Sequence, residues 1–199
     1  MEEKLGRRER KKMLSRQAIL DAAVREFSTK GFRETSVADI MNAADLGIGT
    51  FYNYFVSKED ILVQLLGLMA KNVATKISEL RAANRPAREQ LAKSASITAA
   101  FLDKNRYVMP LFLSAAEHYA HNDGVENETK IKSPGFKMLF EDILREGQRL
   151  GEFRQDLPPE IIAEMFHSVY QAAAFSHLDI SFTENVAMKT EILLDGIKA

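Results

Sequence analysis

Residues 47–55, which read GIGTFYNYF, bring together side chains that can contact a nucleic acid. At 100° per residue, one face of a helix here has a small polar centre with a tyrosine at each edge. Its residues are Gly49, Thr50, Asn53, Tyr52 and Tyr54. Small residues let a helix backbone enter a groove, while threonine and asparagine reach base edges and tyrosine hydroxyls reach phosphates. The pattern therefore predicts a groove-binding surface; a plain turn with half-buried tyrosines is the alternative.

The opposite side of the same segment is apolar. It carries Ile48, Phe51 and Phe55, which the helical wheel predicts to face inward. Gly47 and Gly49 open the segment, so that its free N–H groups and positive dipole end can approach a phosphate oxygen. The glycines are therefore expected to serve close approach as well as the turn.

Carboxylate and histidine pairs offer a second kind of chemistry. Glu164 and His167 have the Glu-x-x-His spacing of carboxylate-bridged metal sites. A second group consists of Glu117, His118, His121 and Asp123. A two-metal bundle needs two Glu-x-x-His pairs plus two more carboxylates, and this chain has one such pair. We therefore expect no metal and no cofactor; an enzyme or metal carrier that uses Glu164 and His167 is the rival hypothesis.

Other catalytic patterns are missing from the sequence. The chain has no cysteine, no nucleophile-elbow glycine pattern and no phosphate-binding glycine loop. A chain without cysteine also suits a reducing cytoplasm. We therefore expect a cytoplasmic protein that is not an enzyme.

Composition predicts an all-α protein. Helix formers dominate the 199 residues, of which 46% are apolar, and no alternating run of polar and apolar residues indicates a strand. The longest apolar stretch, ILVQLLGLMA, is shorter than the ~20 residues that a membrane-spanning helix needs. We therefore expect a soluble protein with no membrane partner.

Charge is distributed unevenly, although the net charge is −1. Residues 1–58 hold 11 basic and eight acidic residues, a net charge of +3, and the rest of the chain has a net charge of −4. Most of the excess lies in a basic arm ahead of the first helix, formed by Arg7, Arg8, Arg10, Lys11 and Lys12. Such an arm is either a solvated tail or a segment that lies on DNA phosphates.

Three helices must position the groove-binding surface. The first is expected at about 15–30 and ends at Gly31, which fits a left-handed cap. Ser36 and Asp39 have capping-box spacing at the start of the second. A tight turn at 45–47 then leads into the glycine- and tyrosine-containing segment, so the three elements describe a helix-turn-helix unit.

Residues 16–66, RQAILDAAVREFSTKGFRETSVADIMNAADLGIGTFYNYFVSKEDILVQLL, resemble the DNA-binding domain of tetracycline-repressor-like (TetR) transcriptional regulators. The pattern TF-Y-YF-SKE is the most specific part of this resemblance. It implies two residues that cap the second helix at the phosphate backbone, six on the recognition helix and one lysine on a phosphate. These are Thr35 and Ser36; Gly47, Ile48, Gly49, Thr50, Tyr52 and Tyr54; and Lys58. The sequence departs from the family at Asp45, often glycine, and at Ile48, often polar.

A long helix that starts near Ser57 is expected to leave the DNA-binding unit without a flexible linker. Further helices are expected at about 87–104, 106–121, 134–151, 159–180 and 183–197. The predicted domains are a basic N-terminal arm at 1–15, a helix-turn-helix domain at 16–58 and a C-terminal helical ligand-binding and dimerisation domain at 59–199.

Phenylalanine, methionine and tyrosine are frequent between residues 101 and 175, and core packing alone would explain them. Similar regulators keep a ligand cavity in this domain, so the resemblance implies a small apolar or aromatic effector. The candidate ligand-binding residues are Met69, Phe101, Met109, Phe112, His118, Phe140, Phe166 and Tyr170.

The last two helices are the predicted dimer surface. Their apolar residues are Ile162, Phe166, Val169, Ala173, Val186, Ile192, Leu193 and Ile197. Two such helices from each of two chains make a four-helix bundle. The resemblance implies a homodimer on double-stranded DNA with a palindromic operator. We expect a repressor whose effector displaces the helix that starts near Ser57; a DNA-binding protein without an effector is the second rival.

Overall fold

The computed structural model describes residues 6–114 and 136–199, and these ranges are predominantly helical. Extended pairing is confined there to an isolated bridge between Phe153 and Lys198. The chain divides into two compact units, Met1–Gln64 with Asn105–Tyr107, and Leu65–Lys104 with Val108–Ala199. The prediction of an all-α protein is confirmed.

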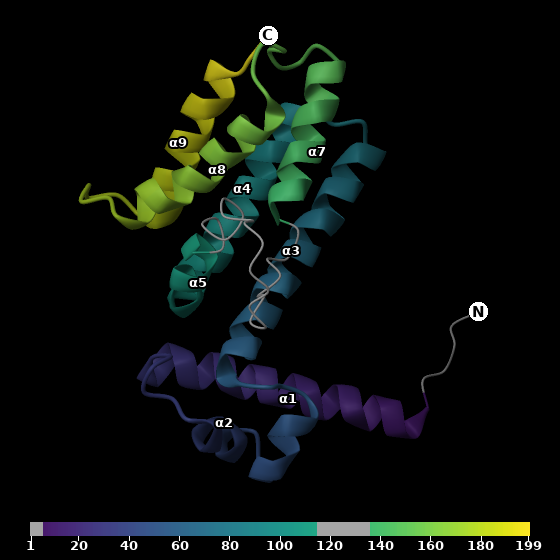
Figure 1. The fold of residues 1–199 in the computed structure, drawn as a ribbon, viewed down its shortest axis with the longest axis vertical. Helices are drawn as coiled ribbons and strands as arrows, with labels where there is room; N and C mark the ends of the chain where they lie inside the picture. The colour runs from purple at the N-terminus through teal and green to yellow at the C-terminus, as the bar shows by residue number, and fades with distance from the viewer. Residues whose placement is uncertain (1–5, 115–135) are drawn as a thin grey trace, which may run out of the picture. The chain divides into compact units, whose positions relative to one another are not determined.

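The first unit contains α1 (Arg7–Lys30), α2 (Val37–Ala43), the 3-10 helix η1 (Ile48–Asn53) and the start of α3 (Lys58–Ala82) (Figure 1). α1 begins eight residues before the expected start at Ser15, because RRERKKML contains strong helix formers and neither glycine nor proline. The expectation of a basic arm ahead of the first helix is therefore wrong. The basic side chains lie on the first turns of α1 itself.

The core of the first unit lies under one face of α1. α1 packs against α2, and α2 packs against η1. The buried apolar residues are Ile19, Leu20, Ala22, Ala23, Phe27, Ile40, Met41, Phe51, Phe55, Ile61 and Leu62. Because removing this apolar surface from water is the main stabilising contribution, the same side chains that hold the unit together also fix η1 on α2.

Local caps hold the connections between these helices. Gly31 ends α1 with a φ of 84°, which glycine adopts without strain, and its N–H donates to the Phe27 carbonyl at 3.1 Å. The predicted capping box of α2 is confirmed: the Ser36 hydroxyl accepts from the Asp39 N–H, and the Asp39 carboxylate accepts from the Ser36 N–H at 2.8 Å. Asp45 takes a φ of 54° before η1, a geometry that aspartate tolerates better than most residues.

The carboxylate of Asp39 has several donors. The Ser36 hydroxyl, the Ser36 N–H and the Lys30 ammonium at 3.0 Å hold the pKa of Asp39 well below its ordinary value of 3.8. Because the folded-state pKa is the lower one, the ionised carboxylate stabilises the folded state above about pH 4, and this contribution is lost as the pH falls through the folded-state pKa. The cap is therefore fully formed at neutral pH.

The second unit contains the rest of α3 and the helices α4 (Ala87–Lys104), α5 (Met109–Ser114), α7 (Phe136–Arg149), α8 (Pro159–Ala174) and α9 (Phe182–Gly196). A 3-10 helix, η2 (Arg106–Val108), lies between α4 and α5. α4 packs against α7 and α9, and α8 packs against the same two helices (Figure 1). Within residues 6–114 and 136–199, no helix combines the length and apolar character that crossing a membrane requires.

Gly147 on α7 allows a close contact within the second unit. A Cβ atom here would come within 2.4 Å of the Phe153 ring and 2.9 Å of the Ala87 Cβ. We therefore expect Gly147→Ala to lower the free energy of unfolding by about 1–3 kcal/mol through overpacking, although alanine is the better helix former. Urea unfolding measures this. Gly67→Ala on α3 is the control, because its Cβ would meet no atom within 4 Å; equal losses in both variants would contradict the prediction.

The prediction for the apolar residues of the last two helices is largely wrong. α8 and α9 pack against each other and against α7 and α4 respectively, and this packing uses the predicted residues. Buried within the chain are Ile162, Phe166, Val169, Ala173, Val186, Leu193 and Ile197. Ile192 alone among the eight is exposed, by 72%. The large apolar residues exposed on α8, α9 and their connection, here called the α8–α9 apolar face, are Ile161, Met165, Phe175, Leu178, Met188 and Ile192.

Candidate nucleic-acid interface

The segment 47–55 forms a short 3-10 helix in place of the expected α-helix. Gly47 precedes η1, and its carbonyl accepts from the Thr50 N–H at 2.8 Å. Phe51 and Phe55 are buried as predicted, with ring centroids 5.6 Å apart. The Tyr52 ring stands edge-on to Phe51, with the centroids 5.4 Å apart. The two phenylalanines therefore anchor η1 and leave its other side to solvent.

The outward side of η1 is largely the one that the sequence predicts. Gly49, Tyr52 and Asn53 are exposed, and Thr50 and Tyr54 are half-buried. Ile48 is 56% exposed, so its predicted inward orientation is wrong. Periodicity gives the side of a helix on which a residue lies, whereas burial also needs a neighbouring element to cover it. Ile48 starts η1 directly after the exposed Gly47, and it is not covered.

Thr35 does not offer its side chain to DNA. It is 1% exposed, and its hydroxyl donates to the Gly31 carbonyl at 2.8 Å, at the end of α1. Ser36 alone caps α2. The expectation that both residues cap the second helix at a phosphate is therefore wrong for Thr35, because its hydroxyl is used inside the protein.

Lys58 also has internal partners. Its ammonium group donates to three backbone carbonyls, those of Phe32 at 2.9 Å, Arg33 at 3.1 Å and Thr35 at 3.0 Å, and lies 4.7 Å from the centroid of the Phe32 ring. An ammonium group has three donors, so none is left for a phosphate in this arrangement. The predicted phosphate contact of Lys58 disagrees with this geometry; the residue instead ties the start of α3 to the loop before α2.

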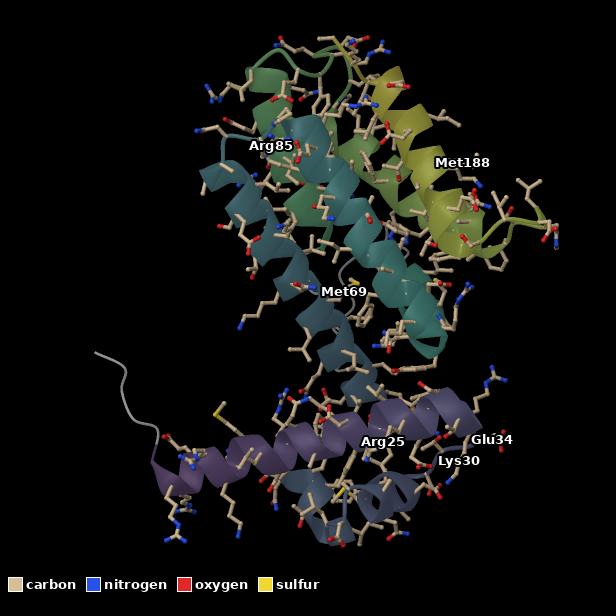
Figure 2. All side chains as sticks on the ribbon, turned by 180° about the vertical axis from the view of Figure 1, so that it is seen from behind. Arg25, Lys30, Glu34, Met69, Arg85 and Met188 are labelled. Atoms are coloured by element: carbon tan, nitrogen blue, oxygen red, sulfur yellow. The ribbon has the colours of Figure 1, made fainter. Side chains whose placement is uncertain are left out.

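Other basic side chains are free to meet an anion. Arg7, Arg8, Arg10, Lys11 and Lys12 are all exposed on α1. Arg33, which the sequence patterns did not indicate, is exposed in the loop between α1 and α2, and its guanidinium forms no ion pair among the described residues. Its position three residues before the N-cap Ser36 is the signal that could have found it. Arg25 and Lys30, in contrast, are used structurally: Arg25 donates to the Ala43 carbonyl at 3.1 Å, and Lys30 pairs with Glu26 and Asp39 (Figure 2).

Neutralising lysines on α1 tests their contact with DNA. If Lys11 and Lys12 lie on phosphates, Lys11→Gln with Lys12→Gln should weaken DNA binding and reduce the slope of log affinity against log salt by ~0.9 for each phosphate that is no longer neutralised. Fluorescence anisotropy titrations at several salt concentrations measure the slope. The control is Lys71→Gln with Lys93→Gln, two lysines of the second unit. An unchanged slope in the α1 variant would show that these lysines are only solvated.

The predicted effector residues form two aromatic pairs in the second unit. The Phe112 ring centroid lies 5.3 Å from that of Tyr170, and Phe140 lies 5.2 Å from Phe166. Met69 and Met109 are buried and Phe101 is half-buried; Met69 lies on the side of α3 that faces α4 (Figure 2). His118 lies outside the described residues.

His167 and Glu164, the residues of the rival metal hypothesis, have different surroundings. The His167 ring stacks on Phe112 with centroids 5.0 Å apart, and burial lowers its pKa. The exposed Glu164 pairs with Lys137 at 2.9 Å. Among the described residues, no group of three or more histidine, aspartate or glutamate side chains could hold a metal ion. Glu117, His121 and Asp123 lie outside those residues.

Comparison with known proteins identifies a family and several individual proteins to which this chain is similar. Residues 19–65 match the family described as "Bacterial regulatory proteins, tetR family". Over 185 residues, covering 92% of this chain and 90% of the relative, the chain is 25% identical to the HTH-type transcriptional repressor KstR2 of Rhodococcus jostii (strain RHA1). Its fold is similar to that of the fatty acid degradation regulator FadR from Bacillus halodurans, with a TM-score of 0.67, 23% identity and coverage of 92% and 99%. It is also similar to FadR of Thermus thermophilus in complex with lauroyl-CoA, with a TM-score of 0.66, 22% identity and coverage of 92% and 95%.

The matched residues include about half of α1, all of α2 and η1, and the start of α3, which form the helix-turn-helix unit described above. The likeness to KstR2 and to the two FadR structures extends through the helices of the second unit. The protein is accordingly a DNA-binding transcriptional regulator and not an enzyme. The helix-turn-helix unit of this chain, matched over residues 19–65, is a DNA-binding domain of the TetR family of bacterial regulatory proteins.

Proposed function

We propose that this regulator is a homodimeric repressor that binds a palindromic operator and is released from it by a small apolar or aromatic effector. The observation that carries the DNA-binding part is the exposed side of η1. Gly49, Tyr52 and Asn53 face solvent while Phe51 and Phe55 are buried behind them. A short element anchored on one side and small and polar on the other suits insertion into a major groove.

The dimer is supported by the α8–α9 apolar face. Six large apolar side chains are exposed there, among them Phe175 at 69% and Ile192 at 72%. Exposed apolar residues on two helices that pack together, and on the segment that connects them, are typical of a protein–protein interface. A two-fold axis through this face would bring four helices together as a bundle, and the dimer would carry two copies of η1, one for each operator half-site. A symmetric dimer requires a palindromic site.

The effector part is supported by the aromatic pairs of the second unit, Phe112 with Tyr170 and Phe140 with Phe166. Apolar ligand sites are lined by such side chains. The FadR relative from Thermus thermophilus was solved with lauroyl-CoA, whose acyl chain is apolar, so acyl chains are a reasonable first class to screen.

Two stretches of chain can pass an effector signal to the DNA-binding unit. α3 belongs to both units, since the division falls at Gln64. Residues 105–107 lie in sequence between α4 and α5 but belong to the first unit, where the Tyr107 ring is 5.3 Å from Phe27. An effector that shifts α5 would therefore act on the core of the first unit through Tyr107 as well as through α3.

Selection of DNA from a pool of random duplexes tests the DNA-binding part. The pure protein should enrich an inverted repeat with half-site centres about one helical turn apart. Enrichment of a single unrepeated site would contradict the dimer on a palindrome. If no sequence is enriched at low salt, specific DNA binding by this chain is wrong.

Phe112→Ala tests whether the aromatic residues line a site or only fill a core. Phe112 is 5% exposed. If it is core alone, its truncation should cost ~3–5 kcal/mol of stability and leave the effector response unchanged. If it lines the site, the variant should lose the thermal shift that an effector from a screen of acyl-chain and aromatic compounds gives the wild type. Phe153→Ala, a buried phenylalanine at 2% exposure outside both aromatic pairs, is the matched control. A screen with no thermal shift for the wild type would favour a regulator without an effector.

A further inference from the structure

Ile48 is an apolar side chain on a surface that is otherwise small or polar. It is 56% exposed, although isoleucine is among the residue types most often buried. Gly47 and Gly49 stand on either side of it, and a Cβ atom at either glycine would meet nothing within 4 Å. The isoleucine side chain therefore projects between two positions that have no side chain. A surface that approaches this end of η1 would contact the Ile48 side chain.

The chemistry of isoleucine limits what it can recognise in a major groove. Its side chain has no hydrogen-bond donor or acceptor. The base edges in the major groove display donors and acceptors at every pair, and the C5-methyl group of thymine is their one apolar group. Pressing isoleucine against the edge of a G·C pair would remove water from polar groups without replacing their hydrogen bonds, which is costly. Against thymine, the same side chain buries a methyl group.

We propose that Ile48 is a specificity-determining residue that selects thymine in each operator half-site through contact with its C5-methyl group. This inference rests on the proposed operator binding by η1. It specifies the base feature, the thymine methyl group, that the first residue of η1 recognises. Burying one apolar carbon is worth about a fourfold change in affinity. A symmetric operator contains the contact twice, so both methyl groups together should contribute about fifteenfold.

Replacing thymine by uracil removes only the methyl group and leaves base pairing intact, so it tests the contact directly. The operator enriched by the wild-type protein is synthesised with uracil at one thymine position at a time, in both half-sites, and titrated with the wild-type protein and with Ile48→Ala. One symmetric thymine pair should show about fifteenfold weaker binding by the wild type after the change. Ile48→Ala should bind the thymine and uracil operators equally.

Val56→Ala is the matched control variant. Val56 is a β-branched residue of the same unit with 85% exposure, and it lies after the last residue of η1. Its response to uracil should equal that of the wild type. Thermal unfolding of both variants establishes that they fold, which is expected because both side chains are exposed.

The possible outcomes distinguish a failure of thymine selection by Ile48 from a failure of operator binding by η1. Loss of the uracil effect in Ile48→Ala, with retention in Val56→Ala, supports thymine selection by Ile48. An equal uracil effect in the wild type and Ile48→Ala, or loss of the effect in Val56→Ala, overturns it. A wild-type protein that binds its operator tightly but ignores every uracil substitution also overturns it, while operator binding itself stands. If the wild-type protein enriches no DNA sequence, both operator binding and thymine selection by Ile48 are wrong.

Discussion

Gly49→Leu should abolish operator binding and leave the protein folded. Gly49 is exposed on η1, and a Cβ atom there would meet nothing within 4 Å, so the protein itself has room for a side chain. Its φ lies outside the left-handed range that only glycine adopts easily. Leucine should therefore cost no stability, and can add up to ~0.8 kcal/mol as the better helix former. The side chain would instead occupy the space that DNA must enter.

Gel-shift titration against the enriched operator measures the loss of affinity, and circular dichroism melts measure stability. Gly67→Leu on α3 is the control, because Gly67 also has open space around its Cβ position but belongs to the second unit. That variant should bind the operator as the wild type does. Normal operator binding by Gly49→Leu would show that this side of η1 does not face the DNA.

Ile192→Glu with Met188→Glu should convert the proposed dimer into monomers. Both residues lie on α9 in the α8–α9 apolar face, with exposures of 72% and 55% (Met188 is labelled in Figure 2). In a two-fold interface each substitution occurs twice, so four carboxylates without partners would be buried. Burying unpaired charges costs several kcal/mol, and the dimer should therefore weaken by at least about 100-fold. Monomers would also lose the joint binding of two half-sites.

Analytical ultracentrifugation over a range of protein concentrations measures the dimer affinity. Leu150→Glu is the control, because Leu150 is 56% exposed but follows the last residue of α7 and lies outside the α8–α9 apolar face. It should remain dimeric. A dimer of unchanged affinity in the Ile192 and Met188 variant would place the two-fold interface elsewhere on the chain.

The helix-turn-helix unit can be predicted from the sequence because its signals are local. Ser36 and Asp39 form the capping box that their spacing predicts, and Phe51 and Phe55 are buried as their periodicity predicts. Caps and short amphipathic segments depend on residues a few positions apart, so the sequence contains the whole pattern. The start of α1 differs from the prediction because the charges of RRERKK suggest an arm, although the same residues are good helix formers.

The residues that could not be predicted depend on contacts between distant parts of the chain. Lys58 donates to carbonyls more than 20 residues away. Thr35 is only four and nine residues from its acceptors Gly31 and Glu26, but the burial of its hydroxyl at the end of α1 depends on how α1 and α2 pack together. A motif shows that such residues recur in related proteins, but only the folded chain shows whether a polar group already has partners within the protein. The same holds for Ile48, whose exposure depends on whether a neighbouring element covers it.

Residue type and short-range spacing are enough to predict the helical class, the cap of α2, the two-sided character of η1 and the family resemblance. Which apolar residues of α8 and α9 remain exposed depends instead on how the helices pack. Both helices have apolar residues on more than one side: Ile162 and Leu193 are buried by the chain's own helices, while Ile161 and Ile192, one position away, are exposed. On a helix neighbouring positions differ by 100°, so only the packing of α8 and α9 on α7 and α4 determines which of them is left for a partner.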